Sequence, residues 1–359
     1  MKIVFDCRWH KKSGIGTFAD NVLMQMLNTD NEFLLLGFKT LPKEFSDSLD
    51  EAALKKIICI PCPVQAFSLK ELLFFPKEIS KIINHYDAYF SPYCNVPSGI
   101  KIPVFTTIHD VVFLDIPEIA GKTGTLIRRI FYKHAIFRSK AIFTVSKFSK
   151  KRIIKTLDCK KQIHVAYNGV PDFFTKKNAL NIQKTDTIIF IGNIKKHKGL
   201  QILIPAFKKF CARLEKGGEK SPTLVIVGSK ENFRTNDKEI SSLIENENQS
   251  NIEFTGFISD EELKVRLSQA KILVQPSFYE GFGFPPLQAL NSGTNAIVSD
   301  IEVFKEVYEG YPVTFFKCAD VTDLAEKLFT VWKDNKPVPD FEERYSFKKT
   351  AEAILSAII

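Results

Sequence analysis

Short apolar runs alternate along the chain with longer stretches of mixed polarity. In the first half these runs are rich in Val, Ile and Phe, and they occupy residues 2–6, 33–38, 57–60, 88–91, 104–108 and 141–145. The stretches between them predict helices, notably at residues 15–27, 69–83 and 148–156. Such short and almost wholly apolar runs are typical of parallel strands that helices cover on both faces.

The second half repeats this pattern. Its apolar runs predict strands at residues 187–191, 224–227, 252–254, 272–275, 296–299 and 313–316. Helices are expected at residues 200–214, 260–269, 286–292 and 321–332, with one more at 347–358. Alternation of six strands with helices in each half predicts an α/β fold with two doubly wound, Rossmann-like sheets.

The chain length agrees with this division. A chain of 359 residues is long for one core and suits two domains. The polar stretch at residues 176–186 is the predicted linker between them. We therefore expect an N-terminal Rossmann-like domain at residues 1–175, a C-terminal one at 185–336, and a closing segment at 337–359.

The composition is that of an ordinary globular protein, with 45% hydrophobic and 25% charged residues. No signal-like segment opens the chain and no run of about 18 apolar residues occurs, so we expect a cytoplasmic protein. The seven cysteines are odd in number and scattered, which favours reduced thiols. Cys59 and Cys62 form one CxxC, but no second Cys/His pair is spaced to complete a zinc site.

The net charge of +9 resides in the first half of the chain. Residues 121–161 carry thirteen basic residues and one acidic residue, and apolar positions alternate with the basic ones at 126–140. A basic helix with an apolar side can lie on an anionic membrane or bind phosphate-bearing ligands. A solvated helix packed on its own domain is an equal alternative. Nucleic acid is not expected as a partner, because no reader motif with stacking aromatics is present.

Ligands of doubly wound sheets bind at the carboxyl ends of the strands, so the loops there are the first candidates. Gly14 and Gly16 open a predicted helix, where backbone N–H groups can approach a phosphate. With Ala19 they also match the dinucleotide fingerprint. However, seven residues separate Gly14 from the strand, and the second strand ends without an acidic residue for a ribose. An NAD site is therefore the weaker interpretation.

Three further strand ends carry candidate chemistry. The loop at residues 192–199 combines two glycines with a cluster of basic side chains that includes Lys198, which suits a diphosphate. Residues 276–288 are rich in Gly, Pro and aromatics, and Glu280 and Gln288 could read sugar hydroxyls there. His109 follows another strand and is a candidate for substrate contact or acid–base work. A solvated turn, a packed corner and a structural histidine are the respective alternatives.

In this order, these loops resemble the retaining glycosyltransferases of sequence family 4, which have the GT-B fold. The similarity extends over nearly the whole chain and rests on Asp6-x-Arg8 with Gly14-Ile-Gly16, Ile108-His-Asp110, Val145-Ser-x-x-Ser149, Tyr167-Asn-Gly169, residues 192–199, Tyr279-Glu-Gly-Phe-Gly-Phe-Pro-Pro-Leu, Ser299-Asp300 with Glu306, and Tyr345-Ser-Phe-Lys-Lys-Thr-Ala351. The resemblance implies two domains that face each other across a cleft, and a closing helix that crosses back onto the first domain. It also implies an acceptor-side first domain, a nucleotide-sugar-binding second domain, and mannosyltransferase-like relatives that build bacterial surface polysaccharides.

The resemblance also implies site residues and partners. Glu280, His109 and Lys198 would be catalytic, and the donor nucleotide sugar would contact Gly14, Gly16, Asn193, Lys198, Gly256, Phe282, Gly283, Phe284 and Gln288. No cofactor or metal is implied, because the donor is a nucleotide diphosphate sugar, with GDP-mannose as the first choice. The acceptor would be a glycan, lipid-linked at the inner membrane face, with peripheral membrane contact through residues 121–161.

Three positions depart from the family pattern. Asn193 stands where the family usually has Arg, although some mannosyltransferase-like members have Asn. Gln288 replaces the second of two glutamates, and a neutral hydrogen bond to ribose is about half as strong as a charge-assisted one. Thr17 stands where many relatives have Arg. A non-catalytic sugar-nucleotide-binding protein of the same fold therefore stays open as an alternative, and an NAD-dependent oxidoreductase is a weaker one.

Overall fold

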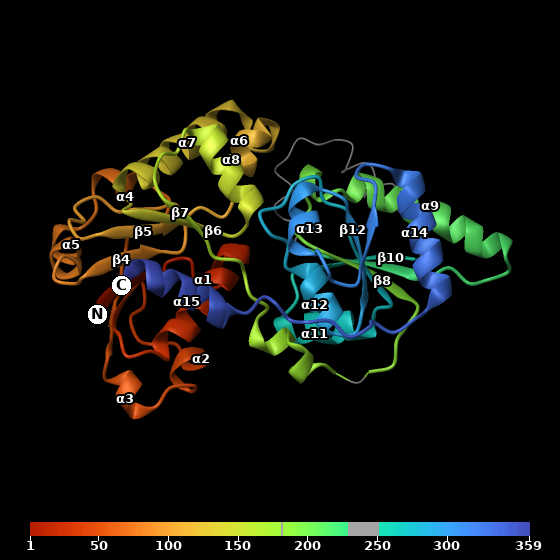
Figure 1. The fold of residues 1–359 in the computed structure, drawn as a ribbon, viewed down its shortest axis with the longest axis horizontal. Coiled ribbons are helices and arrows are strands. Elements are labelled where there is room, and N and C mark those ends of the chain that lie inside the picture. The colour runs from red at the N-terminus through yellow and green to blue at the C-terminus, as the bar shows by residue number, and fades with distance from the viewer. Residues whose placement is uncertain (181, 229–250) are drawn as a thin grey trace. The chain divides into compact units, whose positions relative to one another are not determined.

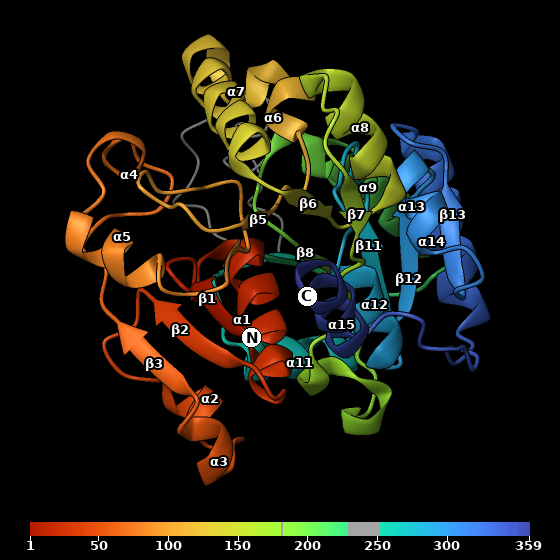
Figure 2. The ribbon, with the colours of Figure 1, turned by 60° about the vertical axis from the view of Figure 1, so that its left-hand side comes forward.

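The computed structural model describes residues 1–180, 182–228 and 251–359 (Figure 1). The chain folds into two compact units, of which the first comprises residues 1–169 and 345–359 and the second residues 170–344. Each unit is a parallel sheet between helices, and Figure 2 shows the first unit from another side.

The first unit has a seven-stranded sheet in the order β3-β2-β1-β4-β5-β6-β7, in which all pairs are parallel. Its strands are β1 (Lys2–Asp6), β2 (Glu32–Leu36), β3 (Ile57–Ile60), β4 (Ala88–Ser91), β5 (Val104–Thr107), β6 (Ala141–Thr144) and β7 (Ile163–Val165). Its helices are α1 (Ser13–Leu27), α2 (Lys43–Ser46), α3 (Glu51–Leu54), α4 (Leu69–Leu73), α5 (Lys77–Ile83), α6 (Val112–Asp115), η1 (Pro117–Ile119), α7 (Gly121–Arg138), α8 (Lys147–Leu157) and α15 (Phe347–Ile358).

The second unit has a six-stranded parallel sheet in the order β10-β9-β8-β11-β12-β13. Its strands are β8 (Thr187–Ile191), β9 (Thr223–Val227), β10 (Ile252–Gly256), β11 (Ile272–Gln275), β12 (Asn295–Ser299) and β13 (Val313–Phe316). Its helices are η2 (Asp172–Phe174), η3 (Lys176–Asn178), η4 (Lys196–Lys198), α9 (Leu200–Lys216), α11 (Asp260–Gln269), α12 (Pro285–Asn291), α13 (Glu302–Val307) and α14 (Val321–Asp334).

The fold class expected from the sequence, two doubly wound α/β sheets, is confirmed. Strands β4, β5, β6 and β11 are buried along their whole length, as expected for sheets covered on both faces. The chain returns to the first unit at Tyr345, and α15 packs against α1 there. The hydroxyl of Ser346 caps α15 by accepting from the backbone N–H of Lys349.

Two expectations about the first unit are wrong in detail. The helix expected at residues 69–83 is two helices, α4 and α5, with a break before Pro76. Proline lacks the N–H that a continuous helix needs, and it disfavours the helical conformation at the preceding Phe75. The sheet also has a seventh strand, β7, which is only three residues long and includes the polar His164.

The strand orders locate the ligand-binding edge of each sheet. In each sheet the second and third strands are added one after another on one side of the first strand. The fourth strand is then added on the other side of the first strand. The neighbouring strands at this reversal are β1 and β4 in the first unit and β8 and β11 in the second. Loops that leave such a pair at its carboxyl ends diverge, which opens a crevice for a ligand.

Candidate functional site

The loops after β8 and β11 meet in an ion pair between Lys198 and Glu280. Lys198 Nζ donates to both carboxylate oxygens of Glu280, at 2.8 Å to Oε1 and 2.7 Å to Oε2. Lys198 ends the short helix η4, and Glu280 lies in the loop that leads into α12. The pair therefore lies at the strand reversal of the second sheet, where the topology predicts a ligand.

The Glu280 carboxylate is held by more than Lys198. Ser277 Oγ donates to Oε1 at 2.7 Å, and Gln275 Nε2 lies 3.3 Å from the same oxygen. Ser299, at the end of β12, donates in turn to the carbonyl oxygen of Ser277. Burial by itself would raise the pKa of Glu280, but the charge and hydrogen bonds of Lys198 and Ser277 leave that pKa below its ordinary value. Glu280 is thus an oriented carboxylate that stays ionised at neutral pH.

Close backbone packing fixes the two loops against each other. The backbone N–H of Phe278 donates to the carbonyl of His197 at 2.8 Å. A Cβ on Gly199 would lie 1.9 Å from the carbonyl oxygen of Pro276, and Gly199 has a φ of +81°. Only glycine fits there, because both the close approach and the left-handed backbone exclude a side chain. Gly199 is also the N-cap of α9, so the first, unpaired backbone N–H groups of that helix lie at this edge of the sheet.

His197, next to Lys198, adds an uncharged polar group. Its side chain is buried, and among the described residues its Nδ1 has no hydrogen-bond partner. Burial and the neighbouring Lys198 lower the pKa of His197 to about 3, so the imidazole is neutral at pH 7.

Apart from Gly14 and Gly16, the other residues predicted to contact the donor belong to the second unit. Asn193 is exposed in the loop after β8, and Gly256 ends β10. Phe282, Gly283 and Phe284 lead into α12, where a Cβ on Gly283 would lie 2.6 Å from the Phe304 ring. Gln288 lies on α12 and is buried.

His109 belongs to the first unit, where it follows β5. Its Nε2 lies 2.9 Å from the carbonyl oxygen of Pro92, and its ring packs edge-on against Phe18. A carbonyl only accepts, so Nε2 carries the proton and Nδ1 of the neutral ring is an acceptor. Burial lowers the pKa of His109 to about 4, so this neutral form prevails at pH 7.

The two predicted glycines of the first unit have different surroundings. A Cβ on Gly16 would lie 2.6 Å from the carbonyl oxygen of Trp9, so the loop after β1 folds tightly over the start of α1. A Cβ on Gly14 would meet no atom within 4 Å. The close packing of Trp9 against Gly16 is enough to account for a glycine at position 16, without any ligand.

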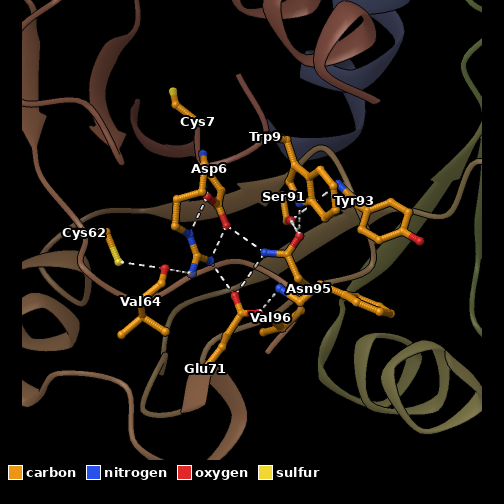
Figure 3. A network of polar contacts seen from close by, with 12 residues as sticks. Asp6, Cys7, Trp9, Cys62, Val64, Glu71, Ser91, Tyr93, Asn95 and Val96 are labelled. Carbon is orange, nitrogen blue, oxygen red and sulfur yellow. Dashed lines mark hydrogen bonds and ion pairs between the residues drawn. The ribbon is translucent and has the colours of Figure 1, made fainter. Parts of the chain in front are cut away.

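A buried polar network occupies the strand reversal of the first sheet (Figure 3). Arg8 Nε donates to Asp6 Oδ1 at 2.8 Å, and a second guanidinium nitrogen donates to Glu71. Asn95 Nδ2 donates to Asp6 at 2.9 Å and to Glu71 at 3.0 Å. Trp9 Nε1 completes the link by donating to Asn95 Oδ1 at 2.8 Å. The network therefore ties the loop after β1 to the loop after β4.

One guanidinium serves two carboxylates in this network. Burial raises the pKa of Asp6, but the charge and hydrogen bonds of Arg8 outweigh it and leave that pKa lowered. Burial dominates at Glu71, whose pKa is raised despite Arg8. The network holds a net negative charge when both carboxylates are ionised, so it orients loops and is not an anion site.

The described residues also show whether the requirements of a metal site, a membrane-spanning helix and a disulfide bond are met. Within them, no group of three or more His, Cys, Asp or Glu side chains could hold a metal ion. None of the described helices is long and apolar enough to cross a bilayer. All seven cysteines are free, including Cys59 and Cys62.

Comparison with known families places this geometry. Residues 172–353 match the family described as glycosyl transferases group 1, and residues 14–172 match glycosyltransferase family 4. The chain belongs to the glycosyl transferases group 1 family. Lys198, Glu280 and Gln288 all fall within its matched region, and the resemblance to family 4 stated from the sequence is confirmed.

Named relatives support this assignment. Over 208 residues the chain is 31% identical to the O-antigen chain mannosyltransferase RfbU of Salmonella typhimurium, and the match covers 56% of this chain and 53% of that protein. The chain thus spans about half the length of this curated relative. Sucrose-phosphate synthase of Thermosynechococcus elongatus has a similar fold, with a TM-score of 0.66 and 14% identity over 100% of this chain and 96% of that one. Anabaena HepE, solved with UDP and glucose, has a TM-score of 0.63 and 15% identity over 99% and 95%.

The sequence does not single out several residues that orient Glu280 and Asp6. Gln275 and Ser277 stand beside Glu280 in the same loop, so their closeness to the carboxylate could have been expected. Ser299 enters the sequence argument only as part of a motif. Glu71 and Asn95 lie far from Asp6 in the sequence, and no motif marks them. Only the fold brings them to one strand reversal.

Proposed function

We propose that the protein transfers a sugar, with retention of configuration, from a nucleotide diphosphate sugar to a glycan acceptor. The single observation that carries this proposal is the Lys198–Glu280 pair at the strand reversal of the second sheet. A fixed cation beside the start of α9 suits a diphosphate, because both favour negative charge at that edge. Membership of the glycosyl transferases group 1 family supports the reaction class.

In the proposed reaction, the bond between the anomeric carbon of the sugar and the diphosphate oxygen breaks. A hydroxyl oxygen of the acceptor forms the new bond on the same face, and its proton passes to the leaving phosphate. Lys198 stabilises the charge that develops on the leaving diphosphate. The reaction needs no metal in this proposal, since Lys198 and backbone N–H groups near residues 282–284 supply the positive field.

Glu280 is proposed to accept hydrogen bonds from hydroxyl groups of the donor sugar. Its carboxylate is already oriented by Lys198, Ser277 and Gln275, so little reorganisation is needed when a sugar binds. Gln288 is proposed to contact the ribose hydroxyls. Because an amide makes neutral hydrogen bonds, nucleotide affinity should be weaker than with a glutamate there.

His109 is proposed to hold a sugar hydroxyl rather than to move a proton. Its Nε2–H is engaged by the Pro92 carbonyl, and its neutral Nδ1 can accept from a hydroxyl. A pKa of about 4 leaves it uncharged across the physiological range.

The donor and acceptor are proposed from the named relatives. RfbU is an O-antigen chain mannosyltransferase, which supports GDP-mannose as donor and a lipid-linked surface polysaccharide as acceptor. HepE was solved with UDP and glucose, which keeps a uridine donor as the second choice. The family assignment favours both over the NAD-dependent oxidoreductase.

Thermal unfolding with GDP, UDP, ADP, TDP, CMP and NAD tests the donor site. A ligand at 100 times its Kd stabilises the folded protein by about 2.7 kcal/mol. A shift with one nucleoside diphosphate and none with NAD is expected. A shift with NAD alone would contradict the proposal.

A non-catalytic sugar-nucleotide-binding protein is the second candidate, because Asn193 and Gln288 depart from the family pattern. This alternative predicts the same thermal shift without chemistry. Slow hydrolysis of the donor, or transfer to any acceptor, distinguishes the two. The proposed enzyme should release nucleoside diphosphate, and Glu280→Gln should reduce that release more than it weakens nucleotide binding.

A further inference from the structure

Helix α7 presents apolar side chains to solvent. Phe131, Tyr132 and Ala135 form its buried face. On the opposite face Leu126, Ile130 and Phe137 are 59%, 50% and 78% exposed. Their spacing of four and seven residues places them in one stripe along the helix. Single exposed apolar residues are ordinary on a protein surface, but a stripe along the outer face of a helix is not.

A second segment of the first unit also exposes apolar side chains. Leu69, Leu73 and Phe74, in and just after α4, are 65%, 66% and 75% exposed. The segment is a neighbour of α7, because the ring of Phe67, just before α4, stacks on Phe131 in the buried face of α7 with centroids 4.1 Å apart. Both ribbon views show α4 and α7 on the same side of the first unit (Figures 1 and 2).

Basic residues accompany the apolar ones, and α7 contains no acidic residue. Lys122, Lys133 and Lys140 are exposed in or beside the outer face of α7, and Lys70 and Lys77 are exposed around α4. The one acidic residue of α4, Glu71, is buried in the network of Figure 3. The surface is thus both apolar and positively charged. We define the α4–α7 surface as Leu69, Leu73, Phe74, Leu126, Ile130 and Phe137 with these five lysines.

We propose that the α4–α7 surface docks on a lipid bilayer that contains anionic phospholipids. Exposed Phe and Leu side chains can enter the headgroup–acyl boundary, while lysines at the same level contact lipid phosphates. A second copy of the chain is a poorer occupant, because a symmetric contact would bring the same basic residues together. The surface also refines the sequence-based expectation for residues 121–161: in α8, Ile153 and Leu157 are buried, whereas α4 contributes from outside that range.

Docking there would place the first unit at the membrane, where a lipid-linked acceptor resides. In that respect the inference rests on the proposed function, but the surface itself does not depend on it. A binding experiment with empty vesicles and no donor tests the surface alone. Its failure would leave the transferase proposal intact, and loss of transfer would leave vesicle binding intact.

Flotation of the full chain with phosphatidylcholine vesicles, with and without phosphatidylglycerol, is the test. We expect retention by the anionic vesicles at low salt, and loss at high salt because the charges are screened. Lys122→Gln with Lys133→Gln should weaken binding about 25-fold, since each exposed charge contributes about five-fold. Phe74→Ser with Phe137→Ser should weaken it at least ten-fold on anionic vesicles at low salt, because two exposed rings are lost from the contact.

Matched controls lie on the same unit away from this surface. Ile58→Ser removes an exposed apolar residue from the edge strand β3, and Lys39→Gln with Lys55→Gln removes two exposed charges. Both controls should bind vesicles within about two-fold of the wild type, because binding at the membrane interface depends on the residues that face the lipid. Thermal unfolding of every variant checks that the fold is kept.

Three results would overturn the inference. Equal binding to neutral and anionic vesicles would remove the role of the basic residues. Unchanged binding by both double variants would show that another surface carries it. A dimer that dissociates in the Phe74→Ser, Phe137→Ser variant, without vesicle binding by the wild type, would assign the surface to a second copy.

Discussion

Gly199 is predicted to hold the Lys198–Glu280 site together by its lack of a side chain. Its Cα lies against the loop after β11, so that a Cβ would meet the Pro276 carbonyl oxygen at 1.9 Å. Gly199→Ala must therefore separate the two loops whose contact positions Lys198 and Glu280. Gly310 offers a matched control, because its φ of +76° is nearly that of Gly199 but no atom lies within 4 Å of its Cβ position.

The two substitutions share the cost of placing alanine in a left-handed conformation, roughly 1–2 kcal/mol. They also share the opposing gain from restricting the unfolded chain, about 0.4–1 kcal/mol. Only Gly199→Ala adds the steric cost of overpacking, typically about 1–3 kcal/mol. The difference between the two variants in free energy of unfolding should therefore be about 1–3 kcal/mol.

Urea unfolding followed by tryptophan fluorescence measures this difference. The chain has two tryptophans, so a Trp9→Phe background leaves Trp332, which packs on Phe210 in the same unit as both glycines. Gly199→Ala should also reduce donor turnover, whereas Gly310→Ala should not. Equal stability of the two variants would refute the argument that the loops pack this closely.

Three further predictions concern charged and titrating groups. Asp6→Asn should destabilise the first unit by about 3 kcal/mol, because it removes a paired, buried carboxylate. Glu71→Gln should cost less, since burial already raises the pKa of Glu71. Denaturant unfolding measures both losses, and a larger loss for Glu71→Gln would contradict the account. The pKa of Glu280 in the folded protein lies below its ordinary value of 4.5, so its contribution to stability is present above that pH and is lost as the pH falls below it. Relative to Glu280→Gln, the wild type should therefore lose more stability between about pH 5 and pH 3, and parallel curves would argue against the ion pair. With a pKa of about 4, His109 should not titrate between about pH 6 and 8. His109→Asn should therefore lower the rate of transfer by the same factor throughout that range. A factor that changes with pH would indicate that His109 acts as an acid or a base.

The sequence predicts much of this fold because both sheets are built from short, buried apolar runs. Runs such as residues 141–145 are recognisable without any tertiary information. β7 is not predicted, because its three residues include His164 and do not form an apolar run. The single helix expected at residues 69–83 rests on the pattern of apolar residues, although Pro76 in the sequence indicates a break there.

The candidate site is predicted less completely. The sequence singles out both Lys198 and Glu280 but not their ion pair, because the pair depends on β8 and β11 being neighbours in the sheet. The buried network of the first unit is equally hidden, since Glu71 and Asn95 carry no motif. In the sequence, α7 shows only that apolar and basic residues alternate. Which of its apolar residues face solvent becomes clear only when the structure shows its buried face.

The release of nucleoside diphosphate from a nucleotide diphosphate sugar tests the central claim most directly. Lys198→Met and Lys196→Met are compared with the wild type, because both lysines belong to the same short helix, η4, and only Lys198 contacts Glu280 among the ion pairs described. The account predicts that Lys198→Met lowers turnover by about 100-fold or more, a typical loss for one group that stabilises developing charge, while Lys196→Met has a far smaller effect. Similar turnover by the wild type and Lys198→Met would contradict the proposed role of the Lys198–Glu280 pair.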